Sequence, residues 1–150
     1  KDEYDRVFNK LLGKKGSENL YEIRRELRKA MDSYVGVFRD REGLETAIKK
    51  IREFKERYKD IGIQDKSKVY NTELINALEL ENMLDVAEVV TISALKREES
   101  RGAHARLDFP KRDDEKFLKH TLAFKDEKED IRIEYIPVNI TYWKPEERKY

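Results

Sequence analysis

The amino-acid sequence predicts a mainly α-helical fold, an antiparallel three-helix bundle followed by a small C-terminal β-hairpin. Three observations support this fold class. Apolar residues recur at steps of three and four in three successive segments, which is the spacing of one helix face. Short connections between these segments favour antiparallel neighbours. After Pro110 the apolar period falls to two, which is the period of a β-strand.

The leading segment, residues 1–16, is predicted to be a short helix and a loop. Its apolar residues are Val7, Phe8, Leu11 and Leu12, and two glycines at 13 and 16 break the pattern. Ser17 or Asn19 then caps the first helix of the bundle, which occupies residues 17–100 with its two successors. The apolar stripe of this first helix consists of Leu20, Ile23, Leu27, Ala30, Met31, Tyr34 and Phe38.

Gly36 falls within this stripe, where a helical glycine is unfavourable relative to alanine, so we expect close packing there. Residues 40–43 are predicted to form the turn to the second helix. That helix starts at Leu44 and ends at Gly62, a natural terminator. Its stripe consists of Leu44, Ala47, Ile48, Ile51, Phe54, Tyr58 and Ile61. Three helices of this kind resemble a spectrin repeat.

The third helix is expected to be the central element. Asn71 caps its start, and Glu73 in the first turn suits the helix dipole. Apolar residues cover most of its circumference, which indicates a helix covered on several sides, by the first two helices and by a partner surface. We expect it to run to about Glu99, with Gly102 as its terminator.

Residues 101–150 are predicted to form an ordered loop, a hairpin and a tail. The strands lie at Thr121–Phe124 and Ile131–Val138, joined by the charged connection 125–130. Aromatic residues in the tail either mark an interface or fold back on the bundle. These tail residues are Tyr142, Trp143 and Tyr150, together with Pro145.

Composition limits the classes of function. The chain has 150 residues, which allows one domain, and 43% of them are charged. Its 33 basic and 32 acidic residues leave a net charge of +1, which argues against a dedicated nucleic-acid-binding protein. No apolar run approaches the roughly 18 residues of a membrane span, and the sequence shows no secretory signal pattern. The absence of cysteine excludes disulfides and thiolate chemistry and fits an intracellular chain.

Two further features concern the origin of the chain. Frequent Lys, Glu and Arg are typical of thermophile proteins, although long solvated helices are charge-rich in any organism. The chain begins at Lys1 and not at methionine, so we expect a fragment or a processed product.

The run ESRGAHAR carries the most distinctive side chains. Arg101 and Arg106 bracket His104, and the planar fork of arginine suits carboxylate or phosphate groups. These three residues therefore either grip an anion or have a structural or interface role. In the second case Arg101 pairs with Glu98 or Glu99, or binds the last carbonyls of the third helix.

No other motif points to an active site. His104 and His120 lack metal-ligand spacing, and there is no P-loop, GxGxxG or GxSxG. The triplet Asp113, Asp114 and Glu115 forms either a metal cluster or, more in keeping with the dipole, a helix start capped by Asp113. Four polar residues interrupt the third helix and form either a solvated strip or contacts to arginines of other helices: Glu79, Glu81, Asn82 and Asp85. We predict no catalytic, cofactor-binding or metal-binding residue.

Four collinear blocks resemble the flavoprotein subunit of succinate dehydrogenase and fumarate reductase. The last block, which contains ESRGAH, a DFP turn, RDDE and LKHTL, is nearly diagnostic. Phe117 keeps the aromatic ring where the family often has Trp or Tyr. The related L-aspartate oxidases share only the SRG-H element. The blocks cover nearly the whole chain: Asn19–Arg39, Leu44–Tyr58, Asp65–Val90 and Ser93–Leu122.

The resemblance implies a single C-terminal helical domain, residues 1–150, of a larger FAD-dependent oxidoreductase. In that family the flavin, the dicarboxylate site and the catalytic residues lie upstream, so this fragment alone is expected to be inactive and to bind no cofactor. The family run maps onto Arg101, His104 and Arg106, which are expected to face the flavin-binding domain of the same subunit. The iron–sulfur subunit is the other implied partner, and the complex would be cytoplasmic and membrane-associated, acting in electron transport and the tricarboxylic acid cycle.

Two alternatives belong to other classes. A free-standing helical adaptor would bind a partner helix or surface, and its reading frame would start just before Lys1. A subunit fragment would instead have a GxGxxG-type strand–turn–helix far upstream. A nucleic-acid-binding bundle would bind with a steep dependence on salt, which the balanced charge disfavours. The equivalent domain of an L-aspartate oxidase stays open as a close relative of the first interpretation.

Overall fold

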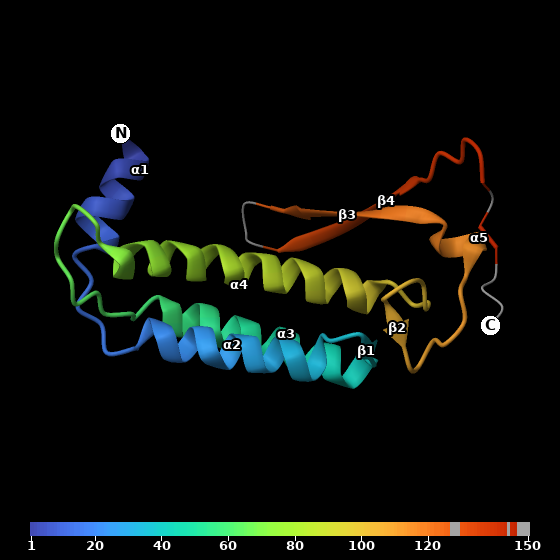
Figure 1. Cartoon of the computed structure of the whole chain (residues 1–150), viewed down its shortest axis with the longest axis horizontal. Coiled ribbons are helices and arrows are strands. Elements are labelled where there is room, and N and C mark those ends of the chain that lie inside the picture. The colour runs from blue at the N-terminus through green and yellow to red at the C-terminus, as the bar shows by residue number, and fades with distance from the viewer. Residues whose placement is uncertain (127–129, 144, 147–150) are drawn as a thin grey trace.

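The computed structural model describes residues 1–126, 130–143 and 145–146. Three long helices lie side by side and alternate in direction, as Figure 1 shows: α2 (Leu20–Tyr34), α3 (Arg41–Tyr58) and α4 (Thr72–Lys96). α1 (Asp2–Tyr4) and the π-helical η1 (Asp5–Leu11) stand at one end of the bundle. The antiparallel hairpin of β3 (Lys119–Lys125) and β4 (Ile131–Pro137) runs along α4. The predicted mainly α fold with a C-terminal hairpin is confirmed.

The core forms where the apolar stripes of the three helices meet. Asn19 and Asn71 cap α2 and α4 as predicted, each accepting a hydrogen bond from a backbone N–H in the first turn. Asp40 caps α3 in the same way, so α3 begins at Arg41, earlier than the predicted start at Leu44. The buried core includes Leu20, Ile23, Leu27, Ile51, Phe54, Ala77, Leu80 and Leu84, with Leu11 and Leu12 from the leading segment.

The prediction for Gly36 and Phe38 is wrong. α2 ends at Tyr34, the buried Val35 caps it, and Gly36 therefore lies beyond the helix. Phe38 is 72% exposed and does not belong to the core stripe. Instead β1 (Phe38–Arg39) pairs in parallel with β2 (Ala105–Arg106), which follows α4. The spacing of apolar residues continues past the end of α2, and this local pattern cannot predict that Phe38 pairs with Ala105.

The predicted end of the third helix is also wrong. α4 ends at Lys96, because Arg97 has extended backbone angles, and Gly102 lies further along the chain. Gly102 adopts a φ of 60°, which favours glycine, at the first central position of a tight turn between Arg101 and His104. The glycine therefore shapes the loop that follows the helix and does not terminate the helix itself.

A short backbone ladder closes the opposite end of the bundle. The N–H of Glu18 donates to the carbonyl of Asp60 over 3.0 Å, and the N–H of Gly62 donates to the carbonyl of Glu18 over 3.1 Å. Only glycine fits at position 16, because a Cβ there would overlap the carbonyl oxygen of Asp60. The loop before α2 is thereby fixed to the end of α3.

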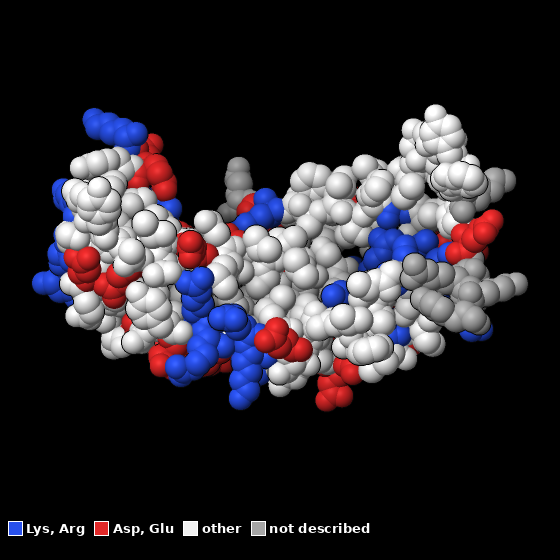
Figure 2. Space-filling view, viewed as in Figure 1, with Lys and Arg blue, Asp and Glu red and all other residues white. Residues whose placement is uncertain are grey.

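Some apolar residues are exposed in the described structure. α2 and α3 cover one side of α4, yet Val86 is 62% exposed, and Figure 2 shows a broad area without charged side chains over this region. Coverage of α4 by a partner stays a prediction. Tyr142 and Trp143 are each 89% exposed, so they do not fold back on the bundle, and Tyr150 lies outside the described residues. No helix in the described part of the chain is long and apolar enough to cross a membrane.

Candidate functional site

The predicted residues Arg101, His104 and Arg106 lie in one compact loop after α4. Ser100 organises this loop, because its hydroxyl accepts the N–H of Arg106 over 2.8 Å and donates to the carbonyl of Phe109 over 2.9 Å. Beside the loop lies the β1–β2 pair, which joins it to the connection between α2 and α3. Figure 2 shows Lys and Arg side chains gathered at this end of the molecule, close to α5 (Asp114–Phe117).

All three guanidinium nitrogens of Arg106 form hydrogen bonds with other groups of this chain. Its side chain is fully buried, and one guanidinium nitrogen donates to the carbonyls of Ala94 and Leu95, both over 3.0 Å. The other two nitrogens bind the Asp108 carboxylate over 2.7 and 2.8 Å. The cation also lies 4.9 Å from the centre of the Phe109 ring. Arg106, not Arg101, therefore binds the last carbonyls of α4, and its buried side chain offers no free face to an anion.

Glu99 is a second buried charge that the sequence did not single out as a site residue. It accepts hydrogen bonds from Arg97 over 3.0 Å, from Arg101 over 2.8 and 2.9 Å, and from the N–H of Asp113 over 2.9 Å. Burial acts to raise the pKa of this carboxyl, but the bonds from Arg101 and Asp113 outweigh it and hold the pKa below its ordinary value. The predicted pairing of Arg101 with an adjacent glutamate is confirmed.

His104 lies between two arginines. Its Nε2 donates to the carbonyl of Arg97 over 3.0 Å, so its Nδ1 accepts from the guanidinium of Arg39 over 2.8 Å. Burial of the ring lowers the pKa of His104, and the charges of Arg39, Arg106 and Arg97 lower it further, against the effect of the carbonyl. The ring is therefore neutral at pH 7 and serves as an acceptor for Arg39.

His104 makes the stability of the chain depend on pH in a defined direction. The unfolded chain takes up its proton as the pH falls through 6.5, whereas the folded chain resists it, so stability falls in this window. His104→Gln removes this titration. Its loss of unfolding free energy between about pH 7 and pH 5 should be smaller than that of the wild type.

Urea denaturation across this pH range is the measurement, and His120→Gln is the matched control at the other histidine, which is exposed. This control separates the effect of His104 from that of replacing a histidine at an exposed position. A His104→Gln profile parallel to the wild type would contradict the proposed neutral state.

The acidic residues have structural partners. Asp113 caps α5 as predicted, accepting from the N–H of Lys116 over 2.9 Å, and Asp114 pairs with Arg101 and Arg112. Within the described residues no group of three or more His, Asp or Glu can hold a metal ion. Two of the four polar residues of α4 contact arginines of other helices, as one of the two interpretations expected: Glu79 pairs with Arg24, and Glu81 with Arg6. Asp85 pairs with Lys55, which is not an arginine.

Cavities of the described structure lie both at this loop and along the bundle. An open hollow of about 600 Å³ is lined by the loop residues Asp108, Phe109 and Arg112 among others, and one of about 380 Å³ lies beside Phe38, Arg39 and Asp40.

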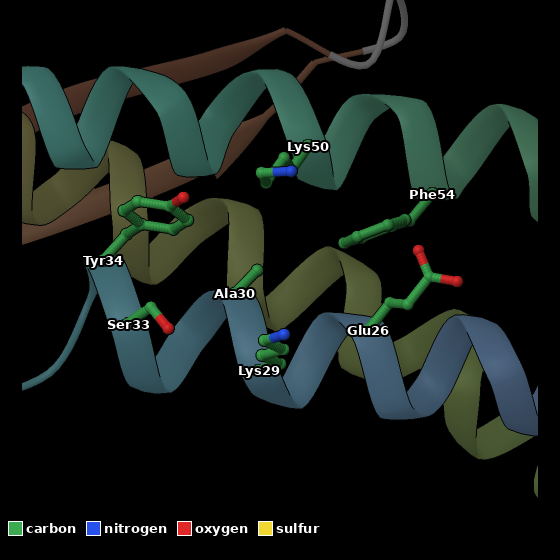
Figure 3. A pocket seen from close by; sticks show the side chains of 7 residues that line it. All are labelled: Glu26, Lys29, Ala30, Ser33, Tyr34, Lys50 and Phe54. Atoms are coloured by element: carbon green, nitrogen blue, oxygen red, sulfur yellow. The ribbon is translucent and has the colours of Figure 1, made fainter.

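Other cavities lie along the bundle. A pocket of about 310 Å³ lies between α2 and α3, and in Figure 3 the carboxylate of Glu26 lies next to the ring of Phe54 at one end of it. Glu26 also pairs with Arg57 over 2.9 Å, so its charge is already compensated. An apolar groove of about 480 Å³ runs between α2 and α4, lined by Leu27, Met31, Met83, Val86, Ala87 and Val90. Neither cavity combines a nucleophile with a neighbouring base.

Comparison with known proteins decides the family. Residues 24–150 match the family described as fumarate reductase flavoprotein, C-terminal part. The chain belongs to this family. This confirms the resemblance predicted from the run ESRGAHAR and the blocks around it. Arg101, His104 and Arg106 lie within the matched residues of this fumarate reductase flavoprotein family member, and their contact with a flavin-binding domain stays a prediction.

Relatives in the family are much longer than this chain. The fumarate reductase flavoprotein subunit of Mycobacterium tuberculosis is 47% identical over 135 residues, which is 90% of this chain and 23% of the relative. The same subunit of Escherichia coli is 45% identical over 142 residues, which is 93% of this chain and 24% of the relative. The succinate dehydrogenase flavoprotein subunit of Rickettsia conorii is 44% identical over 134 residues, covering 89% and 22%. The chain thus spans about a quarter of the length of these relatives.

A solved structure has the same fold. An E. coli quinol fumarate reductase variant superposes with a TM-score of 0.92 at 42% identity, covering 97% of this chain and 25% of that chain. The adenylylsulfate reductase of the hyperthermophilic Archaeoglobus fulgidus is more distant, with a TM-score of 0.74 at 25% identity over 83% of this chain and 20% of that chain. Most of the fold of this chain is therefore also found in this other reductase.

Proposed function

We propose that this chain is the non-catalytic C-terminal helical domain of an FAD-dependent flavoprotein subunit that interconverts succinate and fumarate. Its task is to support the flavin-binding domain and the assembly of the subunit. Cofactors carry the redox chemistry of such enzymes, while the surrounding protein supplies orientation and electrostatics. The flavin and the dicarboxylate would be bound by the upstream part of the subunit.

One observation carries the proposal. The guanidinium of Arg106 donates hydrogen bonds to a backbone carbonyl of α4 and to the carboxylate of Asp108. The carboxylate of Glu99 forms ion pairs with Arg97 and Arg101. The most distinctive side chains of the sequence therefore stabilise a loop conformation. An active-site arginine would keep donors for its substrate. This arrangement is typical of a rigid support for a neighbouring surface.

The proposal extends to the assembly. The similar structures include a quinol fumarate reductase of E. coli and an Sdh1 complex of Mycobacterium smegmatis. We infer an iron–sulfur subunit as a partner and association with the membrane through the complex. The exposed Tyr142 and Trp143 are candidates for such a contact, because exposed aromatic residues are enriched at protein interfaces.

Flavin retention tests whether the flavin is bound by the upstream part of the subunit and not by this chain. The purified chain is incubated with FAD and desalted, and its absorbance at flavin wavelengths is compared with that of the full-length subunit treated in the same way. We expect no retained flavin and no succinate oxidation by the chain, against stoichiometric flavin in the full-length subunit. Flavin retained by the chain in a one-to-one ratio would refute the proposal.

A further inference from the structure

Arg39 is a half-buried cation without a carboxylate partner among the described residues. Its guanidinium donates to the carbonyl of Gly36 and to Nδ1 of His104, both of which are neutral acceptors. Burial lowers the pKa of Arg39, and the nearby charge of Arg106 lowers it further. Arg106 itself is neutralised by Asp108, and Arg97 by Glu99. A desolvated charge that lacks a counter-ion is unfavourable in the isolated chain.

Exposed apolar side chains lie on the same two backbone segments as this cation, and the hollow beside Arg39 is also lined by Asp40 and Glu42. Val37 is 53% exposed, Phe38 72% and Leu107 62%. Backbone hydrogen bonds hold them together, because the N–H of Ala105 donates to the carbonyl of Val37 and the N–H of Leu107 donates to the carbonyl of Arg39. We name these residues the tip patch: Val37, Phe38, Arg39 and Leu107. An apolar patch next to one uncompensated charge is typical of the centre of a protein interface.

We propose that the tip patch docks on the remaining, N-terminal part of the same subunit, and that a carboxylate of that part pairs with Arg39. This inference rests on the function proposed above. The occupant follows from chain length and charge, since the matching family is the C-terminal part of subunits about four times as long as this chain. The neutral His104 fixes the direction of the guanidinium, so that a planar carboxylate meets a prepared fork.

Amide hydrogen exchange in the full-length subunit tests the inference. Exchange at residues 36–40 and 104–108 should be about tenfold slower in the full-length subunit than in the 150-residue chain, equivalent to 1.4 kcal/mol of added protection. Arg39→Gln in the full-length subunit should return this exchange most of the way to that of the chain. Arg39→Lys, which keeps the charge but loses the fork, should give an intermediate rate.

The control is Arg25→Gln, which removes an exposed arginine that pairs with Glu22 on α2. It should leave the exchange at the tip patch unchanged. The circular dichroism of each variant in the isolated chain shows whether the bundle is intact, and Arg39→Lys replaces Arg39→Gln if the latter fails to fold.

Each other outcome refutes a different statement. No slowing anywhere on the chain in the full-length subunit would refute the supporting function. Slowing confined to other surfaces would refute only the tip patch as the docking site. Slowing at the tip patch that Arg39→Gln leaves intact would refute the carboxylate pair. Slowing that appears in the isolated chain as its concentration rises would make a second copy the occupant.

Discussion

Replacing Glu99 by glutamine is expected to lower the free energy of unfolding by about 3 kcal/mol, since removal of one member of a buried ion pair leaves an uncompensated charge. The side chain of Glu99 is fully buried, and both Arg97 and Arg101 donate to it. Glutamine keeps the shape but supplies one neutral acceptor oxygen in place of a charged carboxylate. Urea denaturation of the chain at pH 7 measures the difference.

Glu98→Gln is the matched control, because Glu98 is the adjacent residue but is 43% exposed and pairs with Arg41 at the surface. Its expected effect is below about 1 kcal/mol, the usual range of an exposed ion pair. Equal effects of the two substitutions would contradict the assignment of Glu99 as a buried anchor.

Glu99 also makes the free energy of unfolding depend on pH in the acid range. Its pKa is lowered on folding from 4.5, so the stability it contributes is present above pH 4.5 and is lost as the pH falls through the lower, folded-state pKa. The difference between the wild type and Glu99→Gln should therefore narrow as the pH is lowered below that value.

Replacing Arg106 by methionine is expected to lower the free energy of unfolding by about 4 kcal/mol. Methionine fills much of the space but leaves the carbonyls of Ala94 and Leu95 without a donor and Asp108 without its counter-ion. For a chain of this size each kcal/mol shifts the melting temperature by about 2–4 °C, so calorimetry should show a fall of about 8–16 °C.

Two variants control this experiment. Arg106→Lys keeps the charge but loses the fork, and should recover about half of the loss. Arg112→Met removes a partly exposed arginine of the same loop, which pairs with Asp114, and should lower stability by no more than about 1 kcal/mol. A melting temperature of Arg106→Met within the range of the Arg112 variant would show that α4 does not need its side-chain cap.

The sequence predicts the local features of this fold well. The helical period and the capping asparagines at 19 and 71 depend on residues within one or two turns, so they are visible without the fold. The β1–β2 pairing is different, because Phe38 finds its backbone partner at Ala105, beyond two helices. No period or motif in the sequence marks that contact.

In the candidate site, too, the sequence predicts local features but not contacts between distant residues. The run ESRGAHAR is unusual in composition, which drew attention to Arg101, His104 and Arg106. Their roles depend on residues that the fold brings to them. Arg39 meets His104 across 65 positions of sequence, and the N–H of Asp113 reaches Glu99 only after the loop has turned back. Sequence reasoning therefore singled out these three residues but did not predict the contact of His104 with Arg39 or that of Glu99 with Asp113.

The backbone ladders at the two ends of the bundle together set how it can respond to force. The Glu18–Asp60 ladder joins the start of α2 to the end of α3, and the β1–β2 pair joins the α2–α3 connection to the loop after α4. A one-turn ratchet of a helix past its neighbours, about 5.4 Å, would have to break at least one ladder. The ladders thus prevent the three helices from sliding past one another. A displacement imposed at one end of the bundle therefore tilts the whole bundle as one rigid body.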